Sequence, residues 1–237
     1  MIDIHTHILP GMDDGAKNVD ESLAMLETQY KQGIETVVLT PHFYRERESP
    51  DHFLGRRQKA ALKLENGLTE LSDEERCHIP HIVLGAEVAW CPNMADWDEL
   101  PLLCMGQTRN LLLELPFAPW YDQLIDQLYD LQSRTGIVPV IAHIERYIKM
   151  QKREHIREIM SMGVPIQFGT DFLFHPLARR AVLKLLRTPG SMLLASDCHG
   201  NTHREPNLKA AMDIVRKKIG VQKAQELERC AAALLEV

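Results

Sequence analysis

Two histidines one residue apart, near the start of the chain, are the first residues that could do chemistry. They are His5 and His7 in the stretch IDIHTHILPGMDDG. In an extended strand the side chains alternate between faces, so both imidazoles should point to the same side. Asp13 and Asp14 follow between two glycines, in a loop that could bring a carboxylate back over the same position. The pattern favours a metal site, and its alternative is a short buried strand with incidental histidines.

Further metal-binding side chains follow apolar runs along the rest of the chain. They are His42 in LTPHF, Glu87 in GAE, Glu114 in LLLE, His143 in IAH, and Asp197 and His199 in ASDCH. Taken singly, Glu114 could cap a helix and His143 could be a hydrogen-bonded core histidine. Taken together, charged residues at the ends of buried strands are costly to desolvate unless they are paired or bound to metal.

Short apolar runs rich in β-branched residues predict the strands that would carry these side chains. Seven such runs occur, at 1–5, 35–40, 81–88, 110–115, 137–143, 164–168 and 191–197. Helical spacing predicts helices at 19–32, 120–135, 155–162, 207–219 and 222–235, and a glycine follows each of the first three. Strands that alternate with helices indicate an α/β fold with a parallel sheet, and seven strands favour a barrel over an open sheet.

In a parallel barrel the carboxyl ends of all strands open on one face, so the nine side chains should meet at one mouth. Nine ligands without a cysteine suit two or three divalent ions, such as manganese, iron or zinc. Four of them are carboxylates, so three divalent ions would leave an excess of about two positive charges. Such a site attracts an anion. Arg146 and Arg204 follow His143 and His199 closely and could bind phosphate oxygens, although each alone could be a solvated surface charge.

The bulk composition limits the class of protein. The chain has 237 residues, of which 45% are hydrophobic and 25% charged, as in an ordinary globular protein. A formal charge of −6 argues against nucleic acid as an electrostatically attracted partner. Five cysteines without a CxxC pair favour a reducing cytoplasm. We expect neither a signal peptide nor a membrane-spanning segment, since the first strand begins at once and no apolar run is long enough.

Six motifs follow in order along the chain: IDIHTHILPGMDDGA, TPHF, GAEV, LLLEL, VIAHIERY and ASDCHG. Together they resemble the PHP (polymerase and histidinol phosphatase) superfamily. More closely, the chain resembles the manganese-dependent bacterial protein-tyrosine phosphatases of capsule and exopolysaccharide operons, the CpsB type. The resemblance covers nearly the whole chain. It implies a distorted (β/α)7 barrel of the TIM-like PHP type, formed as a single phosphatase domain over 1–237, with a trinuclear metal site.

The same resemblance distributes the nine side chains over three Mn²⁺ ions. It places His5, His7, Glu87 and Asp197 on the first ion, bridges Glu87 to a second ion held by Glu114 and His143, and gives the third ion Asp14, His42 and His199. Arg146 and Arg204 correspond to phosphate-binding arginines. Two segments depart from the family pattern, QFGTDFLFHP at 167–176 and the strongly basic stretch at 44–57. The latter belongs to the charged, least regular part at 44–73, RERESPDHFLGRR and then a helix, which we expect to be an excursion on the barrel face. We expect both to shape substrate access.

The activity that the resemblance implies is hydrolysis of a phosphotyrosine protein, specifically the C-terminal tail of a membrane-anchored tyrosine autokinase. A hydroxide shared by two bridged cations would attack phosphorus, while the third cation and the two arginines neutralise the phosphoryl oxygens. Asp13 is a candidate proton donor, and its alternative role is to turn the loop. A covalent cysteine mechanism is not expected. We expect no Cys-x5-Arg loop that could form a phosphate cradle, and Cys198 should point away from its neighbours Asp197 and His199.

Three other functions stay open at this point. A small-molecule phosphatase of the histidinol-phosphatase kind would use the same residues. An amidohydrolase also places H-x-H at a barrel mouth, but that group commonly has a lysine on the fourth strand, where this chain has Glu114. A non-catalytic metal-binding subunit of a polysaccharide-export complex would hold metal without hydrolysing a substrate.

Overall fold

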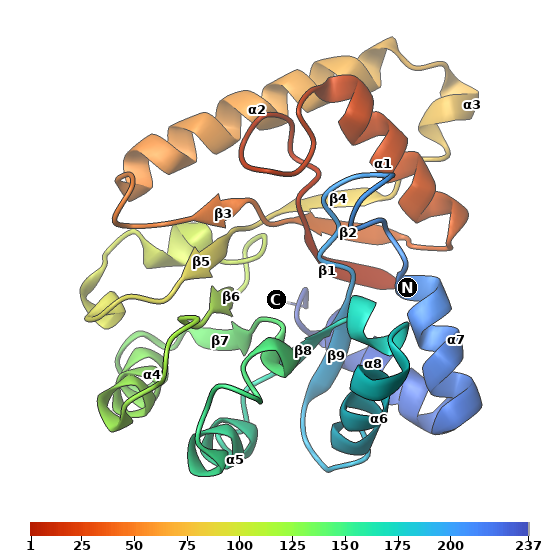
Figure 1. Cartoon of the computed structure of the whole chain (residues 1–237). Coiled ribbons are helices and arrows are strands. Elements are labelled where there is room, and N and C mark those ends of the chain that lie inside the picture. Colours follow the sequence, from red (N-terminus) through yellow and green to blue (C-terminus); the bar gives the residue numbers. More distant parts are fainter. Residues whose placement is uncertain (237) are drawn as a thin grey trace.

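Short parallel strands alternate with helices in the computed structural model, which describes residues 1–236 (Figure 1). The strands are β1 (Ile2–Thr6), β2 (Thr36–Leu39), β3 (His42–Phe43), β4 (His81–Leu84), β5 (Glu87–Ala89), β6 (Asn110–Glu114), β7 (Val138–Ile141), β8 (Ile166–Gly169) and β9 (Met192–Ala195). The helices are α1 (Val19–Lys31), α2 (Pro50–Glu70), α3 (Asp73–Arg76), α4 (Asp122–Thr135), α5 (Arg153–Ser161), α6 (Pro176–Leu185), α7 (Leu208–Lys218) and α8 (Val221–Ala233). The mixed α/β class with parallel strands is confirmed.

The strands form two parallel sheets, ordered β1-β2-β4 and β3-β5-β6-β7-β8-β9. The chain passes from the first sheet to the second between β2 and β3, and again between β4 and β5. Pro41 lies at the first of these breaks and has no N–H to donate to a ladder. Backbone hydrogen bonds from Gly85 to Leu39 and from Glu87 to Pro41 span the gap. The apolar run 81–88, which the sequence predicts as one strand, is therefore two strands.

Five helices lie where helical spacing predicts them, with ends that differ by at most two residues. Three other described helices, α2, α3 and α6, were not anticipated in full. α2 begins within the stretch that looked irregular, because Ser49 caps its first turn by accepting a hydrogen bond from His52 N and Pro50 fits the first helical position. α6 also begins at a proline, Pro176. No helix described within residues 1–236 is long and apolar enough to cross a membrane.

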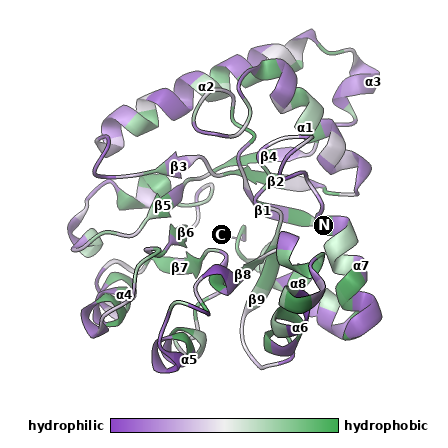
Figure 2. Cartoon of the chain, viewed as in Figure 1, coloured by the Kyte–Doolittle hydropathy of each residue, from purple (hydrophilic) through white to green (hydrophobic). Residues whose placement is uncertain are grey.

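Apolar side chains lie in two buried clusters. The larger cluster packs the helices against the strands, and the helices turn their hydrophilic residues outward (Figure 2). The smaller cluster takes a side chain from most strands and two from the C-terminal helical region: Ile4, Val38, Leu112, Val140, Leu193, Ala231 and Leu234 are among its members. The strand ends that bear the polar residues are thus held from both sides by apolar packing.

Two glycines of α2 should respond differently to alanine. Gly55 is exposed with open space beside it, whereas a Cβ on Gly67 would lie 2.3 Å from Cγ1 of Val19 in α1. Gly55→Ala should raise the free energy of unfolding by about 0.5–1 kcal/mol, because alanine loses less backbone entropy in a helix. Gly67→Ala should be less stable than Gly55→Ala by about 1 kcal/mol or more, because Val19 or α1 must move. Urea unfolding measures both, and equal stabilisation would show that α1 and α2 do not pack in this way.

Candidate metal centre

The nine predicted ligand residues lie at the carboxyl ends of strands or in the loops that follow them. His5 is in β1, His42 begins β3, Glu87 begins β5, Glu114 ends β6, His7 and Asp14 follow β1, His143 follows β7, and Asp197 and His199 follow β9. Eight of the nine side chains are more than four-fifths buried, and Asp14 is mostly exposed. The structure therefore gathers residues that are up to 194 positions apart in the sequence.

Four of these side chains share one small volume. Nε2 of His5 and Nε2 of His7 lie 3.1 Å apart. Each of these nitrogens also lies 3.2–3.4 Å from Oε2 of Glu87 and 3.3 Å from Oδ1 of Asp197. Neighbouring ligands of one cation with bond lengths of about 2.0–2.2 Å lie roughly 3 Å apart. The four donor atoms have the spacing of one coordination shell.

Strict alternation along β1 does not produce this arrangement. The pairing of β1 with β2 shifts register between Asp3 and Thr6, an irregularity of the β-bulge kind. Ile4 accordingly joins the smaller apolar cluster, while His5 and His7 still converge. The expectation that the two histidines share a side holds, but the assumption of an undisturbed strand between them was wrong.

Two further groups adjoin the first. Nε2 of His143 lies 2.9 Å from Oε1 of Glu87 and 3.4 Å from Oε1 of Glu114. Oδ1 of Asp14 lies 3.3 Å from Nε2 of His199 and 3.6 Å from Nε2 of His42. The two oxygens of Glu87 thus face different groups, as a bridging ligand requires.

His42 has a position of its own between these groups. Its Nδ1 lies 2.8 Å from Oε2 of Glu87, while its Nε2 faces Asp14. It is close enough to share a cation either with Asp14 and His199 or with Glu87 and Glu114. Its assignment to a third ion stays a prediction.

The arrangement of the donor atoms in the centre favours binding of a cation over hydrogen bonding between the donors themselves. Oε2 of Glu87 and Oδ1 of Asp197 are buried, and neither makes a hydrogen bond. Both face ring nitrogens of His5 and His7, and those two nitrogens also face each other. Buried carboxylate oxygens without hydrogen bonds are costly unless a charge compensates them. A set of imidazole and carboxylate donors of this kind fits a divalent metal ion.

The histidines have raised affinities for protons where they meet the carboxylates. Burial opposes charge on His7, but its hydrogen bond to Asp13 and its contacts with the carboxylates of Asp197 and Glu87 outweigh burial, so its pKa lies well above the ordinary value. Burial also opposes charge on His143, yet hydrogen bonds to Glu114 and Glu87 raise its pKa to about 9. The centre therefore favours positive charge, and a metal ion would compete with these protons.

The carboxylates show the complementary shift. Burial raises the pKa of Glu87 and of Asp197, but the charge of His5 and contacts with other imidazoles outweigh it and lower both pKa values well below the ordinary value. His199 behaves differently from the other histidines. Burial and the nearby positive charges of His7 and Arg204 lower its pKa to about 4, so its ring is neutral and can donate a lone pair.

Asp13 and Gln167 hold the rings of the centre in place. Oδ2 of Asp13 lies 2.7 Å from Nδ1 of His7 and accepts from the backbone N–H of His42, while Oδ1 accepts from Gly15 N. Burial raises the pKa of Asp13, but the hydrogen bond and charge of His7 outweigh it and lower the pKa below the ordinary value. Oε1 of Gln167 accepts from the backbone N–H of His143 at 2.6 Å and lies 3.4 Å from Nδ1 of His5.

Gln167 is a residue that the sequence analysis missed. Its signal was available, since it is a polar residue in the middle of an apolar strand and is fully buried. Gly15 is a second one. A Cβ at Gly15 would lie 2.0 Å from the backbone oxygen of His7, so only glycine lets the loop of Asp13 and Asp14 return this closely to the strand.

Backbone strain is concentrated at the same place. Four non-glycine residues have positive φ, and three of them are His143 (30°), Asp197 (54°) and Arg204 (49°). Such conformations cost about 1–3 kcal/mol each and persist where the surroundings over-determine them. Their presence at three site residues is typical of a functional centre.

Arg146 and Arg204 lie side by side over the centre. Each donates to Oδ2 of Asp197, and Nη1 of Arg204 lies 2.9 Å from Nε2 of His199. Their side chains are about one-quarter exposed, so the guanidinium groups are accessible from outside while they contact the buried carboxylate. Two adjacent guanidinium groups can bind a tetrahedral anion through several oxygens at once.

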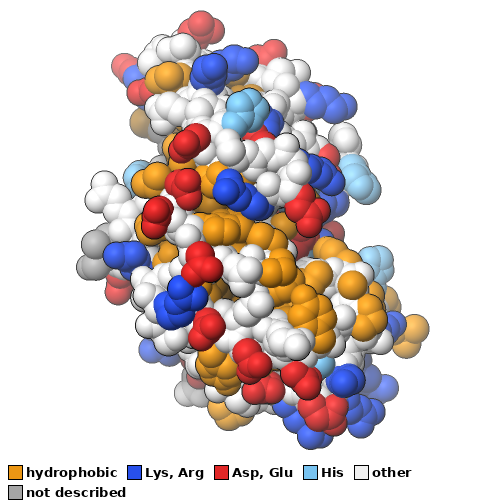
Figure 3. Space-filling view, turned by 90° about the vertical axis from the view of Figure 1, so that its left-hand side faces the viewer, with side chains coloured by type: hydrophobic (Ala, Val, Ile, Leu, Met, Phe, Trp, Pro, Cys, Tyr) orange, Lys and Arg blue, Asp and Glu red, His pale blue; other side chains and the backbone are white. Residues whose placement is uncertain are grey.

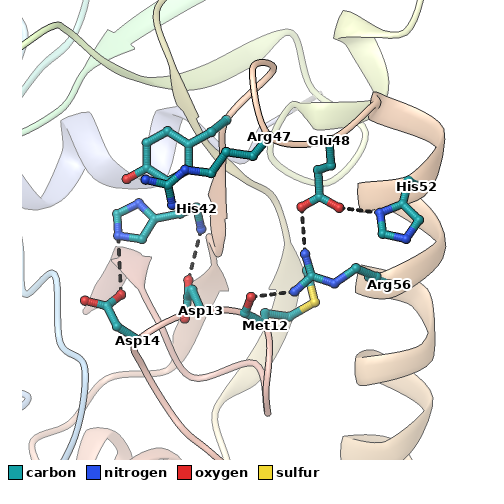
Figure 4. Close-up of a pocket in the computed structure, with 9 residues that line it drawn as sticks. Met12, Asp13, Asp14, His42, Arg47, Glu48, His52 and Arg56 are labelled. Atoms are coloured by element: carbon teal, nitrogen blue, oxygen red, sulfur yellow. Dashed lines mark hydrogen bonds and ion pairs between the residues drawn. The ribbon is translucent and has the colours of Figure 1, made fainter.

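A pocket of about 700 Å³ opens beside the centre, next to Asp14 and His42 (Figure 4). The basic stretch at 45–57 forms one wall, but half of its arginines are bound to this chain. Arg56 donates to Glu48 and to a backbone carbonyl of the loop after β1, and Arg57 donates to two other backbone carbonyls. The other two arginines lie over aromatic rings, Arg45 over Trp97 and Arg47 over Tyr44.

Cys198 lies on the far side of its strand from the centre. The expectation that the chain has no Cys-x5-Arg loop was wrong, because the segment CHGNTHR at 198–204 has this spacing of cysteine-dependent phosphatases. The thiol is fully buried and accepts from Nε2 of Gln29, and burial raises its pKa. The backbone N–H of His199 donates to Arg204 O and cannot line a phosphate loop. The spacing therefore does not make a cysteine site here.

The fold and the site together define a class of protein, an α/β protein with a buried histidine and carboxylate centre that is capped by two arginines. Residues 1–235 match the family model described as capsular polysaccharide synthesis, CpsB/CapC, and the chain belongs to this family.

Comparison with proteins of known name is consistent with this class of protein. The chain is 32% identical to the tyrosine-protein phosphatase CpsB of Streptococcus pneumoniae, over 96% of this chain and 94% of that protein. It is 29% identical to the tyrosine-protein phosphatase YwqE of Bacillus subtilis, over 99% and 91% of the two chains. A solved structure superposes with a TM-score of 0.84 at 27% identity, covering 99% of this chain and 94% of that one. It comes from a study of YwqE and CpsB as metal-dependent tyrosine phosphatases.

Protein treated with EDTA should lose thermal stability as the pH rises from 6.5 to 9. The folded chain keeps the His143 proton up to a pKa of about 9, whereas an ordinary histidine loses it near 6.5. This stabilisation is complete below pH 6.5 and is lost as the pH rises through 9. The lowered pKa values of Glu87 and Asp197 add stability above the ordinary carboxyl values, which is constant across this window. Calorimetry of the EDTA-treated protein should show a Tm at pH 9 that is about 5 °C or more below the Tm at pH 6.5.

Two variants control this measurement. His143→Gln should flatten the decline, because the titrating ring is gone. His155→Gln removes another buried histidine, which pairs with Asp122 away from the centre, and should leave the decline in place. A Tm that stays constant or rises over the window would contradict the proton affinity inferred for the centre.

Proposed function

We propose that this chain is a metal-dependent protein-tyrosine phosphatase of capsule or exopolysaccharide synthesis. The observation that carries the proposal is the position of Asp197. One of its oxygens faces the ring nitrogens of His5 and His7, and the other accepts from Arg146 and Arg204. A cation-binding centre and an anion-binding pair of arginines therefore meet at one carboxylate, as hydrolysis of a phosphomonoester requires.

The strands are proposed to close into a distorted (β/α)7 barrel of the TIM-like kind, as one phosphatase domain over 1–237. β2 with β3, and β4 with β5, each count as one interrupted position, which gives seven positions in order. A parallel bridge pairs Thr6 with Cys198, and His7 N donates to Cys198 O. These contacts join the end of β1 to the chain that follows β9, so the first position adjoins the last.

We assign the resident ions to the donors described above. His5, His7, Glu87 and Asp197 are proposed to hold one ion, Glu87 with Glu114 and His143 a second, and Asp14, His42 and His199 a third. Mn²⁺ is the proposed ion, since the donors are nitrogen and oxygen without sulfur. When bound, divalent ions would supply Lewis acidity toward a phosphoryl oxygen and activation of a water molecule.

The protein side chains orient these donors and bind the phosphoryl group. Asp13 and Gln167 accept at the Nδ1 side of His7 and His5, which directs both Nε2 lone pairs into the centre. We assign Asp13 this positioning role in place of proton donation, because its oxygens already accept three hydrogen bonds. Arg146 and Arg204 are proposed to bind phosphoryl oxygens and to neutralise charge that develops on them.

The proposed substrate is a phosphotyrosine protein, and the C-terminal tail of a membrane-anchored tyrosine autokinase is the predicted partner. A tyrosine leaving group has a phenol pKa of about 10, so it departs with less protonation than an alkyl alcohol would need. The cytoplasmic location expected from the sequence is supported by five free cysteines.

Removal and return of metal test the proposal directly. EDTA should abolish hydrolysis of a phosphotyrosine peptide and Mn²⁺ should restore it, with metal content measured on the same samples. Cys198→Ser should keep its activity, because the thiol lies away from the centre. Full activity of metal-stripped protein would refute the proposal. Faster turnover of histidinol phosphate than of the peptide would favour the small-molecule phosphatase, and bound metal without turnover would favour a regulatory subunit.

The two arginines should contribute to turnover without holding metal. Arg146→Ala and Arg204→Ala should each lower kcat/KM by about 10²–10³-fold, the usual loss when one donor to a developing negative charge is removed. Arg134→Ala is the matched control, since Arg134 pairs with Asp96 on the exposed surface. Steady-state kinetics and metal analysis of the three variants measure this. Unchanged kinetics for both site variants would show that the phosphoryl group binds elsewhere.

A further inference from the structure

A second cavity, of about 270 Å³, adjoins the centre at Glu114. It lies over the end of β5, between the loop that follows β3 and the loop that follows β6. Tyr44 lines it from the first loop and Phe117 from the second, and Trp90 and Leu115 also line it. Three aromatic side chains thus surround a space that ends at a carboxylate of the proposed metal centre.

The two facing aromatic rings are tied to histidines of the centre. The ring of Tyr44 lies 5.5 Å from the ring of His42, and the ring of Phe117 stacks at 5.9 Å on the ring of His143. Both histidines contact Glu87, at 2.8 and 2.9 Å. The cavity therefore borders the two histidines that contact Glu87, next to the proposed metal centre.

Other side chains fix these rings before any ligand binds. The guanidinium carbon of Arg47 lies 4.2 Å from the ring centroid of Tyr44, and the ring of Phe117 packs 5.1 Å from that of Tyr147. Tyr147 itself is fully buried. A preformed aromatic cavity loses little side-chain entropy when a ring enters it.

Phe117 is nevertheless 53% exposed, which leaves much of its apolar surface in water. The packing of the core does not require an exposed phenylalanine at this position. The space-filling view of the side that carries β3, β5 and α4 shows a band of hydrophobic side chains bordered by charged ones (Figure 3). An aromatic ligand in the cavity would remove part of this apolar surface from water.

We propose that this cavity receives the aromatic ring of an aryl phosphomonoester, and that Tyr44 and Phe117 determine specificity for aryl over alkyl esters. The inference rests on the proposed function, since it requires that the phosphoryl group binds at the centre. The ring of a phosphotyrosine side chain would lie between the two aromatic walls. An alkyl ester has no group that fills this space, so it should bind through its phosphoryl group alone.

Phosphonates test the proposal without interference from leaving-group chemistry, because their carbon–phosphorus bond is not hydrolysed. Isothermal titration calorimetry on Mn²⁺-loaded protein should give a dissociation constant for phenylphosphonate about tenfold or more below that for methylphosphonate. Tyr44→Ala and Phe117→Ala should each reduce this ratio by about threefold or more. Tyr44→Phe keeps the ring and should keep the ratio. Phe174→Ala removes an aromatic side chain that is 41% exposed outside the cavity and should also keep it.

The outcomes separate the two proposals. Equal binding of both phosphonates by the unaltered protein, or a ratio that both alanine variants preserve, would overturn the aryl cavity and leave the phosphatase proposal standing. If neither phosphonate binds to metal-loaded protein, the phosphoryl site and the cavity proposal both fail. A ratio that falls in the alanine variants and persists in Tyr44→Phe and Phe174→Ala supports the assignment of both residues.

Discussion

The buried carboxylate of Glu87 is the contact on which the rest of the site depends. Its two oxygens lie within 3.4 Å of ring nitrogens from four histidines, which come from three strands or the loops that follow them, β1, β3 and β7. A carboxylate removed from water in this way is stable only beside positive charge. In the protein alone, protons on the imidazoles supply it, as the raised pKa values of His7 and His143 indicate. A divalent ion would supply more charge in the same space.

This requirement also explains where the backbone is strained and where polar groups are buried. His143 and Asp197 follow β7 and β9 with positive φ, which turns each side chain back over the strand ends. Gln167 fixes the backbone N–H of His143, and Asp13 fixes His7 from the opposite side. The surrounding apolar clusters supply the stability that offsets this strain. Stable packing and a strained centre are therefore parts of one arrangement.

The sequence predicted the histidines and acids that meet at this centre because metal chemistry restricts the side chains that can be used. Histidines and acids at the ends of apolar runs stand out, and parallel topology implies that such ends meet. Gln167 and Gly15 were harder to predict, because their roles depend on contacts with His143 and His7 that only the folded chain makes. The register shift in β1 and the bounds of the helix Pro50–Glu70 were also not predicted from the sequence. Local signals such as Ser49 and Pro50 were present, but the charge of the stretch concealed them.

Asp197 links the cation centre to the anion site. Oδ1 faces His5 and His7, and Oδ2 accepts from Arg146 and Arg204. If a cation draws negative charge toward Oδ1, the arginines interact less strongly with Oδ2 and become better able to bind an outside anion. A phosphoryl group that binds the two arginines would weaken their interaction with Asp197, and the carboxylate could then interact more strongly with the cation. Under the proposed assignment, occupation of either site would favour the other, and a single carboxylate would couple substrate binding to metal binding.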